Sequence, residues 1–285
     1  MVTISGYSDK ADLHTHTSAS DGSSSPEQLI DEAIRLGLRA VAVTDHDVID
    51  GIPAARARAR GTGLEVVDGV EINTEGLQRE VHILGYFIDI DNRELKERLR
   101  SLRLAREARA EKIVRRLKEL GKDIDLYRVL EIAGDGSVGR PHIGLAMMEK
   151  GYVGSVAEAF QSYIGYGAPA YVPRYKIDPL EAIGMVLIAG GVPVYAHPGL
   201  ADRDELIPDM VRSGLKGIEV FYPDHDERQR SRYKKIADDY GLIMTGGSDY
   251  HGLGANFRTH LGDEVVDYRV VEALGNLSNQ RPWRV

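Results

Sequence analysis

The sequence contains no cysteine, and this absence limits the chemistry that the chain can use. Without thiols there can be no disulfide framework and no thiolate metal site. Any transition-metal site must therefore be built from histidine, aspartate and glutamate. The lack of cysteine does not by itself decide the compartment in which the protein works.

Long apolar runs are missing as well. No stretch approaches the roughly 18–20 consecutive apolar residues that a membrane-spanning helix needs. Residues 1–10 include Asp9 and Lys10 and have no apolar core, so they do not predict a signal peptide. We therefore expect a cytoplasmic protein with no membrane partner.

The chain also lacks an excess of positive charge, because its 285 residues carry a formal net charge of −8. This balance argues against a protein that coats nucleic acid, and we expect no stable nucleic-acid complex. It does not exclude an anionic substrate, since bound divalent metal ions can reverse the local field. With 42% hydrophobic and 28% charged residues, the composition is that of an ordinary globular chain, and the length suffices to bury a core.

Strand-like and helix-like segments alternate towards both ends of the chain. The clearest helix is 26–36, with Ser25 as N-cap, Pro26 at the first position and Gly37 at the end. Further helices are expected at 51–60, 178–190, 204–213, 226–240 and 267–277, and strands at 12–14, 39–44, 64–73, 80–88, 192–196, 217–221 and 242–246. Such alternation predicts a mostly parallel sheet or a barrel.

The middle of the chain interrupts this alternation. Residues 92–122 form one long helical pattern, with leucine and isoleucine at three- and four-residue spacing, and helices continue to about residue 163. The long segment carries 12 Lys and Arg against 5 Glu, a net charge of +7, so the rest of the chain carries −15. We interpret 92–175 as an inserted helical subdomain between the barrel segments 1–91 and 176–285. Its charge is either a solvated helix face or a binding surface, and the sequence leaves both open.

Several of the nine histidines stand where a predicted strand ends, which is where α/β folds place their active sites. His14 and His16 lie two residues apart in an extended segment, so both can face one ion. Asp249 and His251 have the same spacing. Further candidates are His46 and His197 after strands, Glu71 at the end of one and His82 within one. Imidazole and carboxylate together suit zinc, manganese or iron.

Each of these residues alone has an ordinary explanation. A lone histidine is commonly a core or surface side chain, an acid such as Glu71 can cap a helix, and Asp45 and Asp47 can be turn residues. No structural reason accounts for so many histidines and acids at neighbouring strand ends. The combination therefore predicts a metal site.

The segments DLHTHTSASDG, VTDHD, GVEIN, VHILGY, AHPG and GSDYHG occur in this order between Asp12 and Gly252. With them the chain resembles the PHP family, named for polymerase and histidinol phosphatase, over nearly its whole length. That family belongs to the amidohydrolase-like metal hydrolases. The resemblance implies an α/β fold, a distorted (β/α)7 barrel with an inserted helical subdomain.

The resemblance also implies a set of metal ligands. They are His14, His16, Asp21, His46, Glu71, His82, His197, Asp249 and His251. Glu71 matches the bridging glutamate, and Asp21 stands where some relatives have histidine. All nine positions hold residues able to bind metal, so a trinuclear site is implied. We expect two to three divalent ions, manganese first, with iron or zinc as the alternatives.

Clustered metals lower the pKa of a bridging water and bind phosphate oxygens. We therefore expect a hydroxide between two ions bridged by Glu71 to attack phosphorus in line, with Asp249 orienting it. The proton donor to the leaving group stays open between His251, His197 and Asp45. For Asp45 we favour another role, that of fixing a ligand imidazole.

The insertion is expected to select the substrate. In DGSVGRPHIG, residues 135–144, Ser137, Arg140 and His142 adjoin a predicted helix start, and helix N-termini and arginine favour phosphate. A simple loop with a helix cap is the alternative. Weaker candidates for a second phosphate or a base are Arg103, Arg106 and Lys176.

The long insert with GRPHI resembles one PHP branch in particular, that of nucleoside 3′,5′-bisphosphate phosphatases and the exoribonuclease RNase AM. This implies hydrolysis of the 3′-phosphate of pAp-like nucleotides, with nucleoside monophosphates as further substrates. A 5′-to-3′ exoribonuclease for short 5′-phosphorylated RNA is the alternative, and a histidinol-phosphate phosphatase is disfavoured by the insert. A non-catalytic metal-binding or RNA-binding module is the alternative of another class. The sequence gives neither the base preference nor the oligomeric state.

Overall fold

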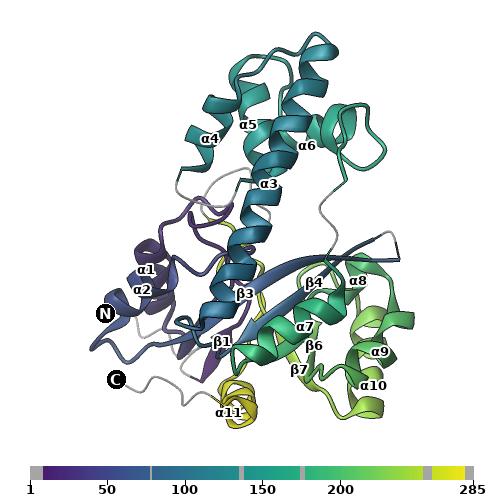
Figure 1. Cartoon of the computed structure of the whole chain (residues 1–285). Coiled ribbons are helices and arrows are strands. Elements are labelled where there is room, and N and C mark those ends of the chain that lie inside the picture. Colours follow the sequence, from purple (N-terminus) through teal and green to yellow (C-terminus); the bar gives the residue numbers. More distant parts are fainter. Residues whose placement is uncertain (1–8, 78, 135–137, 174–176, 253–258, 280–285) are drawn as a thin grey trace. The chain divides into compact units, whose positions relative to one another are not determined.

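The computed structural model of the chain describes residues 9–77, 79–134, 138–173, 177–252 and 259–279. The chain divides into two compact units (Figure 1). The barrel unit comprises residues 1–98 and 176–285, and the helical unit comprises residues 99–175. Within the described ranges, no helix has both the length and the apolar character that crossing a membrane requires.

One sheet of eight strands, counted over the described residues, forms the centre of the barrel unit, in the order β7-β6-β5-β4-β3-β2-β1-β8. The strands are β1 (Lys10–Asp12), β2 (Ala40–Val43), β3 (Glu65–Gly76), β4 (Arg79–Tyr86), β5 (Val192–Tyr195), β6 (Gly217–Phe221), β7 (Ile243–Gly246) and β8 (Val266–Asp267). Neighbouring strands run parallel except at β3–β4, β4–β5 and β1–β8. Backbone bonds from Leu13 N–H to the Gly246 carbonyl and from His16 N–H to the Tyr250 carbonyl join the two sides, so the barrel is nearly closed.

Helices follow most of the strands. They are α1 (Pro26–Leu36), α2 (Ile52–Ala59), α7 (Pro179–Ile188), α8 (Pro198–Ala201), the 3-10 turn η2 (Asp204–Leu206), α9 (Ile207–Arg212), α10 (Glu227–Tyr240) and α11 (Tyr268–Leu277). The start of α1 follows from its cap: the Ser25 hydroxyl accepts from Gln28 N–H, and the Gln28 side chain accepts from Ser25 N–H. It ends at Gly37, whose φ of 76° suits glycine. Both ends match the predicted bounds.

Apolar side chains from the strands form the core of the barrel. Its buried members include Leu13, Ala42, Val67, Leu84 and Val194. Each such aliphatic side chain contributes about 1.5–3 kcal/mol by leaving water. Buried Tyr86 belongs to the same core and donates its hydroxyl proton to the Leu13 carbonyl at 2.8 Å. The core therefore fixes the backbone from which His14 and His16 project.

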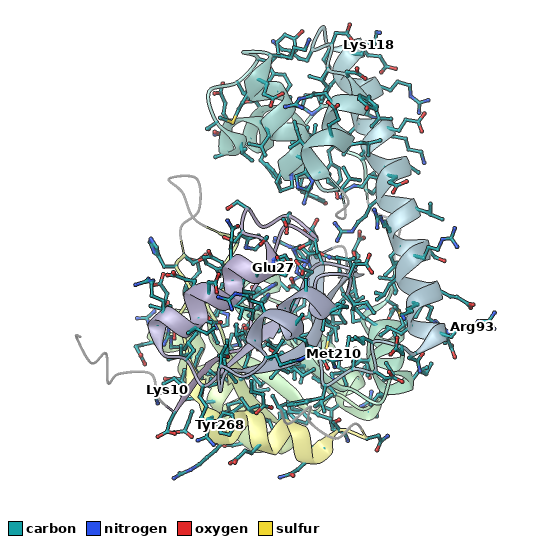
Figure 2. The ribbon with its side chains drawn as sticks, turned by 90° about the vertical axis from the view of Figure 1, so that its left-hand side faces the viewer. Lys10, Glu27, Arg93, Lys118, Met210 and Tyr268 are labelled. Atoms are coloured by element: carbon teal, nitrogen blue, oxygen red, sulfur yellow. The ribbon has the colours of Figure 1, made fainter. Side chains whose placement is uncertain are left out.

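The helical unit has a core of its own. It contains most of α3 (Arg93–Glu119) together with α4 (Leu126–Ala133), α5 (Arg140–Glu149), α6 (Val156–Ala159) and the π-helical turn η1 (Phe160–Ile164). Arg93 and Lys118, labelled in Figure 2, lie near the two ends of α3. Buried side chains such as Ile113, Leu117, Val129, Ile143 and Met147 pack among these helices.

The helical unit begins at Leu99, inside α3, whereas the sequence places the start of the insertion at residue 92. The reason is that the first turns of α3 are bonded to α7. Arg98 forms an ion pair with Glu181 at 3.3 Å, and the Asn92 side-chain amide donates to the Ile188 carbonyl at 3.1 Å. Helical periodicity continues through this point, so the pattern alone gives no boundary there.

Candidate metal centre

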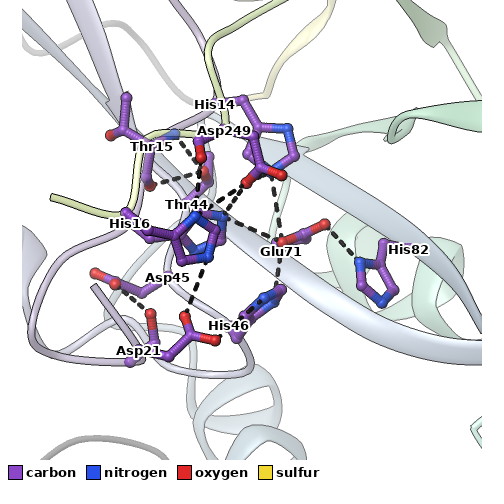
Figure 3. Close-up of polar contacts among 12 residues, drawn as sticks. His14, Thr15, His16, Asp21, Thr44, Asp45, His46, Glu71, His82 and Asp249 are labelled. Carbon is purple, nitrogen blue, oxygen red and sulfur yellow. Dashed lines mark hydrogen bonds and ion pairs between the residues drawn. The ribbon is translucent and has the colours of Figure 1, made fainter. Parts of the chain in front are cut away.

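All nine side chains expected as metal ligands lie together in the barrel unit. They form four overlapping groups in which the potential ligand atoms lie within 4.8 Å of one another. The groups are His16, Asp21, His46 and His251; His14, His197 and Asp249; His14, His16 and Glu71; and His46, Glu71 and His82. Figure 3 shows Glu71 between His82 on one side and His14 and His16 on the other.

The Glu71 carboxylate turns one oxygen to each side of the cluster. Its Oε2 lies 3.4 Å from His14 Nε2 and 3.3 Å from His16 Nε2. Its Oε1 lies 2.8 Å from His82 Nδ1 and 2.9 Å from His197 Nε2. His46 Nδ1 also lies 2.9 Å from Oε2. A buried carboxylate with different imidazoles at each of its two oxygens has the arrangement of a bridging ligand between two ions.

Two carboxylate oxygens lie close to both Nε2 atoms of His14 and His16. Asp249 Oδ1 lies 3.4 Å from His14 Nε2 and 3.1 Å from His16 Nε2, and Glu71 Oε2 completes the group at 3.4 and 3.3 Å. Bonds of about 2.0–2.1 Å to a tetrahedral ion place neighbouring ligand atoms about 3.3–3.4 Å apart. Each of these four histidine–carboxylate distances therefore lies near the spacing of two ligands on one ion.

A third group surrounds Asp21. Its carboxylate oxygens lie 3.4 Å from His251 Nε2 and 3.9 Å from His46 Nε2. His251 Nδ1 donates to the Asp249 carbonyl at 2.8 Å, which leaves its Nε2 facing Asp21. His46 also reaches Glu71, whose Oε2 lies 2.9 Å from its Nδ1. The third group is thus continuous with the Glu71 site.

Hydrogen bonding within the protein leaves several atoms of the cluster unsatisfied. The buried atoms without a hydrogen-bond partner include His14 Nε2, both ring nitrogens of His16, Asp21 Oδ1, Glu71 Oε2 and His82 Nε2. An unsatisfied buried polar atom costs about 1–3 kcal/mol, so such atoms rarely gather without a ligand. A mixed set of imidazole and carboxylate donors suits zinc, manganese or iron. The residues present therefore fit divalent metal ions.

Electrostatics within the cluster also favour cations. Burial raises the pKa of Glu71, but His46, His82 and His14 outweigh it and hold this pKa well below its usual value. Burial lowers the pKa of His14, but the carboxylates of Glu219, Asp249 and Glu71 outweigh it and hold this pKa well above the usual value. The negative potential that retains a proton on His14 also attracts divalent cations, which displace such protons when they bind.

Unusual backbone conformations bring the last ligands into place. His197 has a φ of 25° and Asp249 a φ of 51°, in the left-handed region that few non-glycine residues adopt. Strain of this kind is typical of functional sites. Just before Asp249 the chain passes close to His14, where a Cβ on Gly247 would lie 2.3 Å from the His14 backbone nitrogen. Only glycine allows this approach.

Asp45 does not have the expected contact with a ligand imidazole. Its Oδ1 accepts from Thr17 N–H at 2.7 Å and from the Ser20 hydroxyl at 2.6 Å, and its Oδ2 accepts from the Thr17 hydroxyl at 2.8 Å. Both oxygens of Asp45 are therefore bonded to the segment 17–20 and not to a ligand imidazole. Contrary to the expectation, Asp45 stabilises the turn that leads to Asp21.

Sequence reasoning missed three side chains that reach the ligands. Glu219 on β6 and Tyr222 just after it contact His14 and Asp249, respectively. The segment GIEVF looks like any buried strand, and the only available signal was a glutamate among apolar residues. Asn73, also missed, places its side-chain amide 3.0 Å from His46 Nδ1.

The substrate candidates in the helical unit occupy the start of α5 and one face of α3. His142 is buried, and its Nδ1 accepts from Gly139 N–H at 3.0 Å, so it caps the helix. The Arg140 guanidinium carbon lies 5.0 Å from the centre of the Phe160 ring. Arg103 is 3.7 Å from Glu107 on α3. Two further candidates, Ser137 and Lys176, lie outside the described residues.

Comparisons with known proteins extend over most of the chain. Residues 12–240 match the PHP domain. A phosphoribosyl 1,2-cyclic phosphate 1,2-diphosphodiesterase of Eggerthella lenta is 34% identical over 245 residues, which are 85% of this chain and 94% of that protein. A 5′-3′ exoribonuclease of Haemophilus influenzae is 33% identical over 247 residues, 85% of this chain and 90% of the relative.

Two further matches also cover most of the chain. A 3′,5′-nucleoside bisphosphate phosphatase of Chromobacterium violaceum is 32% identical over 263 residues, 87% of this chain and 89% of the relative. Among solved structures, that of a candidate metal-dependent phosphoesterase from Bifidobacterium adolescentis superimposes with a TM-score of 0.87 at 32% identity. It covers 94% of this chain and 96% of its own. The similarity therefore includes the barrel and the helical insertion.

Proposed function

Because this chain belongs to the PHP family of metal-dependent phosphoesterases, we propose that it hydrolyses the 3′-phosphate of nucleoside 3′,5′-bisphosphates, with nucleoside monophosphates as further substrates. The observation that carries the chemistry is Glu71, with one carboxylate oxygen towards His82 and His197 and the other towards His14, His16 and His46. Divalent ions bound in such a site activate water and neutralise phosphate oxygens.

The nine side chains form three sets of candidate ligands, one for each ion. When metal is bound, His14, His16 and Asp249 would hold one ion, His82, His197 and Glu71 a second, and Asp21, His46 and His251 a third. His251 and Asp249 have the most exposed side chains of the cluster, at 23% and 19%. A phosphate group would therefore approach from their side, where Asp249 is placed to orient a water molecule.

The substrate class is supported by the helical unit. The match to the Chromobacterium violaceum phosphatase covers 87% of the chain, and the part left over is smaller than the 77 residues from 99 to 175. The similarity to that protein therefore includes a part of this unit. Within it, Arg140 opens the ten-residue helix α5, and both arginine and a helix N-terminus favour phosphate. We assign the 5′-phosphate to this region.

The experiment is hydrolysis of pAp by the full chain with manganese, followed by chromatography of the products and compared with hydrolysis of AMP and of a ribose 1,2-cyclic phosphate. Faster turnover of pAp supports the proposal. Turnover of the cyclic phosphodiester alone would replace it with the activity named for the Eggerthella lenta relative. The His14→Ala variant is the control for contaminating phosphatases, since loss of one ligand must abolish the metal-dependent rate.

A second candidate, a 5′-to-3′ exoribonuclease on short 5′-phosphorylated RNA, is favoured by an aromatic surface of the helical unit. Tyr166 has an exposed fraction of 79%, and its ring lies 5.4 Å from that of Tyr171. Arg109 and Arg140 lie 5.8 and 6.0 Å from the Tyr171 ring. Of these side chains Tyr166 is exposed, whereas Tyr171 is half-buried and Arg109 is buried. An exposed aromatic ring is suited to stacking a base of a single strand.

The two candidates are separated by the Tyr166→Ala variant. Loss of one stacked base costs about 1–3 kcal/mol, or roughly a 5- to 150-fold higher KM for an oligonucleotide. The KM for pAp should stay unchanged if it binds without Tyr166. Tyr127, with an exposed fraction of 67% on α4, provides the matched control as Tyr127→Ala. Equal effects of both variants would argue against the exonuclease.

A further inference from the structure

Strand β6 provides none of the nine ligands, yet two side chains from its end of the barrel contact three of them. Glu219 is fully buried within the strand, and Tyr222, also buried, follows it directly. Exposure to solvent is 0% for Glu219 and 6% for Tyr222, too little to explain their polar groups. Their contacts with the ligand residues explain why polar groups are buried here.

Glu219 accepts hydrogen bonds from two different ligands. His14 Nδ1 lies 3.0 Å from its Oε1, and His197 backbone N–H donates to its Oε2 at 2.7 Å. An ionised carboxylate has no proton to give, so His14 must donate from Nδ1. This fixes the imidazole with its Nε2 free, and Nε2 is the atom that faces Glu71 and Asp249.

Tyr222 has the corresponding effect on Asp249. Its hydroxyl donates to Asp249 Oδ2 at 2.9 Å, so Oδ1 is the oxygen left facing His14 and His16. The Tyr222 ring also packs beside the His197 ring, with 5.3 Å between their centres. One hydrogen bond thus selects which carboxylate oxygen enters the ligand group.

We propose that Glu219 and Tyr222 are positioning residues of the metal centre. They bind no ion themselves. Glu219 fixes the tautomer of His14 and the backbone at His197, and Tyr222 fixes the rotation of the Asp249 carboxylate. Groups that orient ligands in this way typically change metal affinity or activity by about 10–100-fold when they are removed. The inference rests on the proposed function, since it assumes that these ligands bind metal.

The decisive variant is Glu219→Gln, because glutamine keeps the shape and loses one acceptor. Two donors face residue 219, and an amide has only one oxygen, so its NH₂ group must meet either His14 Nδ1–H or His197 N–H. We expect the affinity for Mn²⁺, measured by chelator competition, to fall about 10–100-fold. The visible absorption spectrum of the Co²⁺-loaded protein should also change, because the geometry around the ion changes.

A second variant, Tyr222→Phe, is expected to fold normally, because it removes only a hydroxyl. It therefore tests the proposal even if Glu219→Gln misfolds. We expect Mn²⁺ affinity to fall by about tenfold, at the lower end of the same range. Matched controls come from the same unit: Glu227→Gln, exposed on α10, and Tyr268→Phe, which loses a hydrogen bond to Glu65 on the strand β3. Both controls should bind Mn²⁺ and hydrolyse substrate as the unchanged protein does.

The outcomes separate the two levels of the proposal. If the unchanged protein binds no Mn²⁺, the proposed function fails. If it binds Mn²⁺ and hydrolyses phosphate esters while both variants keep its affinity and its Co²⁺ spectrum, only the positioning roles are refuted. Lower affinity in both variants, with the melting temperature of the metal-free protein retained in Tyr222→Phe, supports them. In that case we expect the fall in Mn²⁺ affinity to be larger in Glu219→Gln than in Tyr222→Phe.

Discussion

Replacing Asp45 by alanine and by asparagine distinguishes a structural role from a catalytic one. Asp45 has an exposed fraction of 1% and accepts three hydrogen bonds from Thr17 and Ser20. Alanine removes all three. Even at about 1 kcal/mol for each bond, the turn loses about 3 kcal/mol. Because 1.4 kcal/mol corresponds to a factor of ten, local opening of the turn should become about 100-fold more frequent.

Asparagine should have a much smaller effect. Its amide oxygen can keep the bonds from Thr17 N–H and the Ser20 hydroxyl, and its NH₂ group can donate to the Thr17 hydroxyl. Burial, partly offset by these hydrogen bonds, raises the pKa of Asp45, so a neutral isostere also relieves the burial of a charge. We expect less than about 1.4 kcal/mol of destabilisation, or below tenfold in local opening.

Hydrogen exchange followed by mass spectrometry over residues 15–24 measures this opening directly. The protein is compared in its chelator-treated form, so that metal release does not contribute, and peptides from 140–164 serve as the internal reference. Fast exchange in Asp45→Ala with near-normal exchange in Asp45→Asn supports the structural role. Unchanged exchange in both variants, with an equal loss of kcat, would refute it and identify Asp45 as the proton donor.

Three other expectations concern the metal centre. Gly247→Ala should destabilise the metal-free protein by about 1–3 kcal/mol in calorimetry, because its Cβ would lie 2.3 Å from the His14 backbone nitrogen; an unchanged melting temperature would contradict the close approach. His14→Ala should lower the bound metal per chain, measured by emission spectroscopy, and an unaltered content would exclude the proposed site. Burial lowers the pKa of His251, but Asp21 and Asp249 outweigh it and raise this pKa to about 10. The imidazole therefore holds a proton at pH 7 that a metal must displace, so affinity should fall as pH falls, and calorimetric titration in two buffers should show proton release.

Local signals allowed much of the barrel to be predicted from the sequence. The N-cap Ser25, Pro26 and the glycine at 37 give α1 its observed ends, and the apolar run in 217–221 gives β6 its observed bounds. Both depend on interactions within a few residues. The strand β8 and the four-residue helix α8 were not predicted, because they are too short for periodicity to reveal.

The nine candidate ligands could be predicted because their residue types and spacing are specific in themselves. Their grouping required the fold: Glu71 and His82 meet only because β3 and β4 pair in antiparallel register, with Glu71 opposite Leu84 and Asn73 opposite His82. Asp45 was misassigned for a related reason. Sequence shows that it neighbours His46, but the direction of its side chain depends on which side of the chain the Thr17 turn occupies.

Glu219 shows why the supporting residues are harder to predict than the ligands. A ligand must present a donor atom to the ion, so its residue type is restricted and its spacing recurs. A positioning residue needs only to reach one atom of a ligand, and here the partners His14 and Glu219 are 205 residues apart in the chain. A buried carboxylate in an otherwise apolar strand is nevertheless costly unless it is paired. Such a glutamate between two ligand-bearing strands, as β6 lies between β5 and β7, therefore predicts a partner among the ligands on energetic grounds alone.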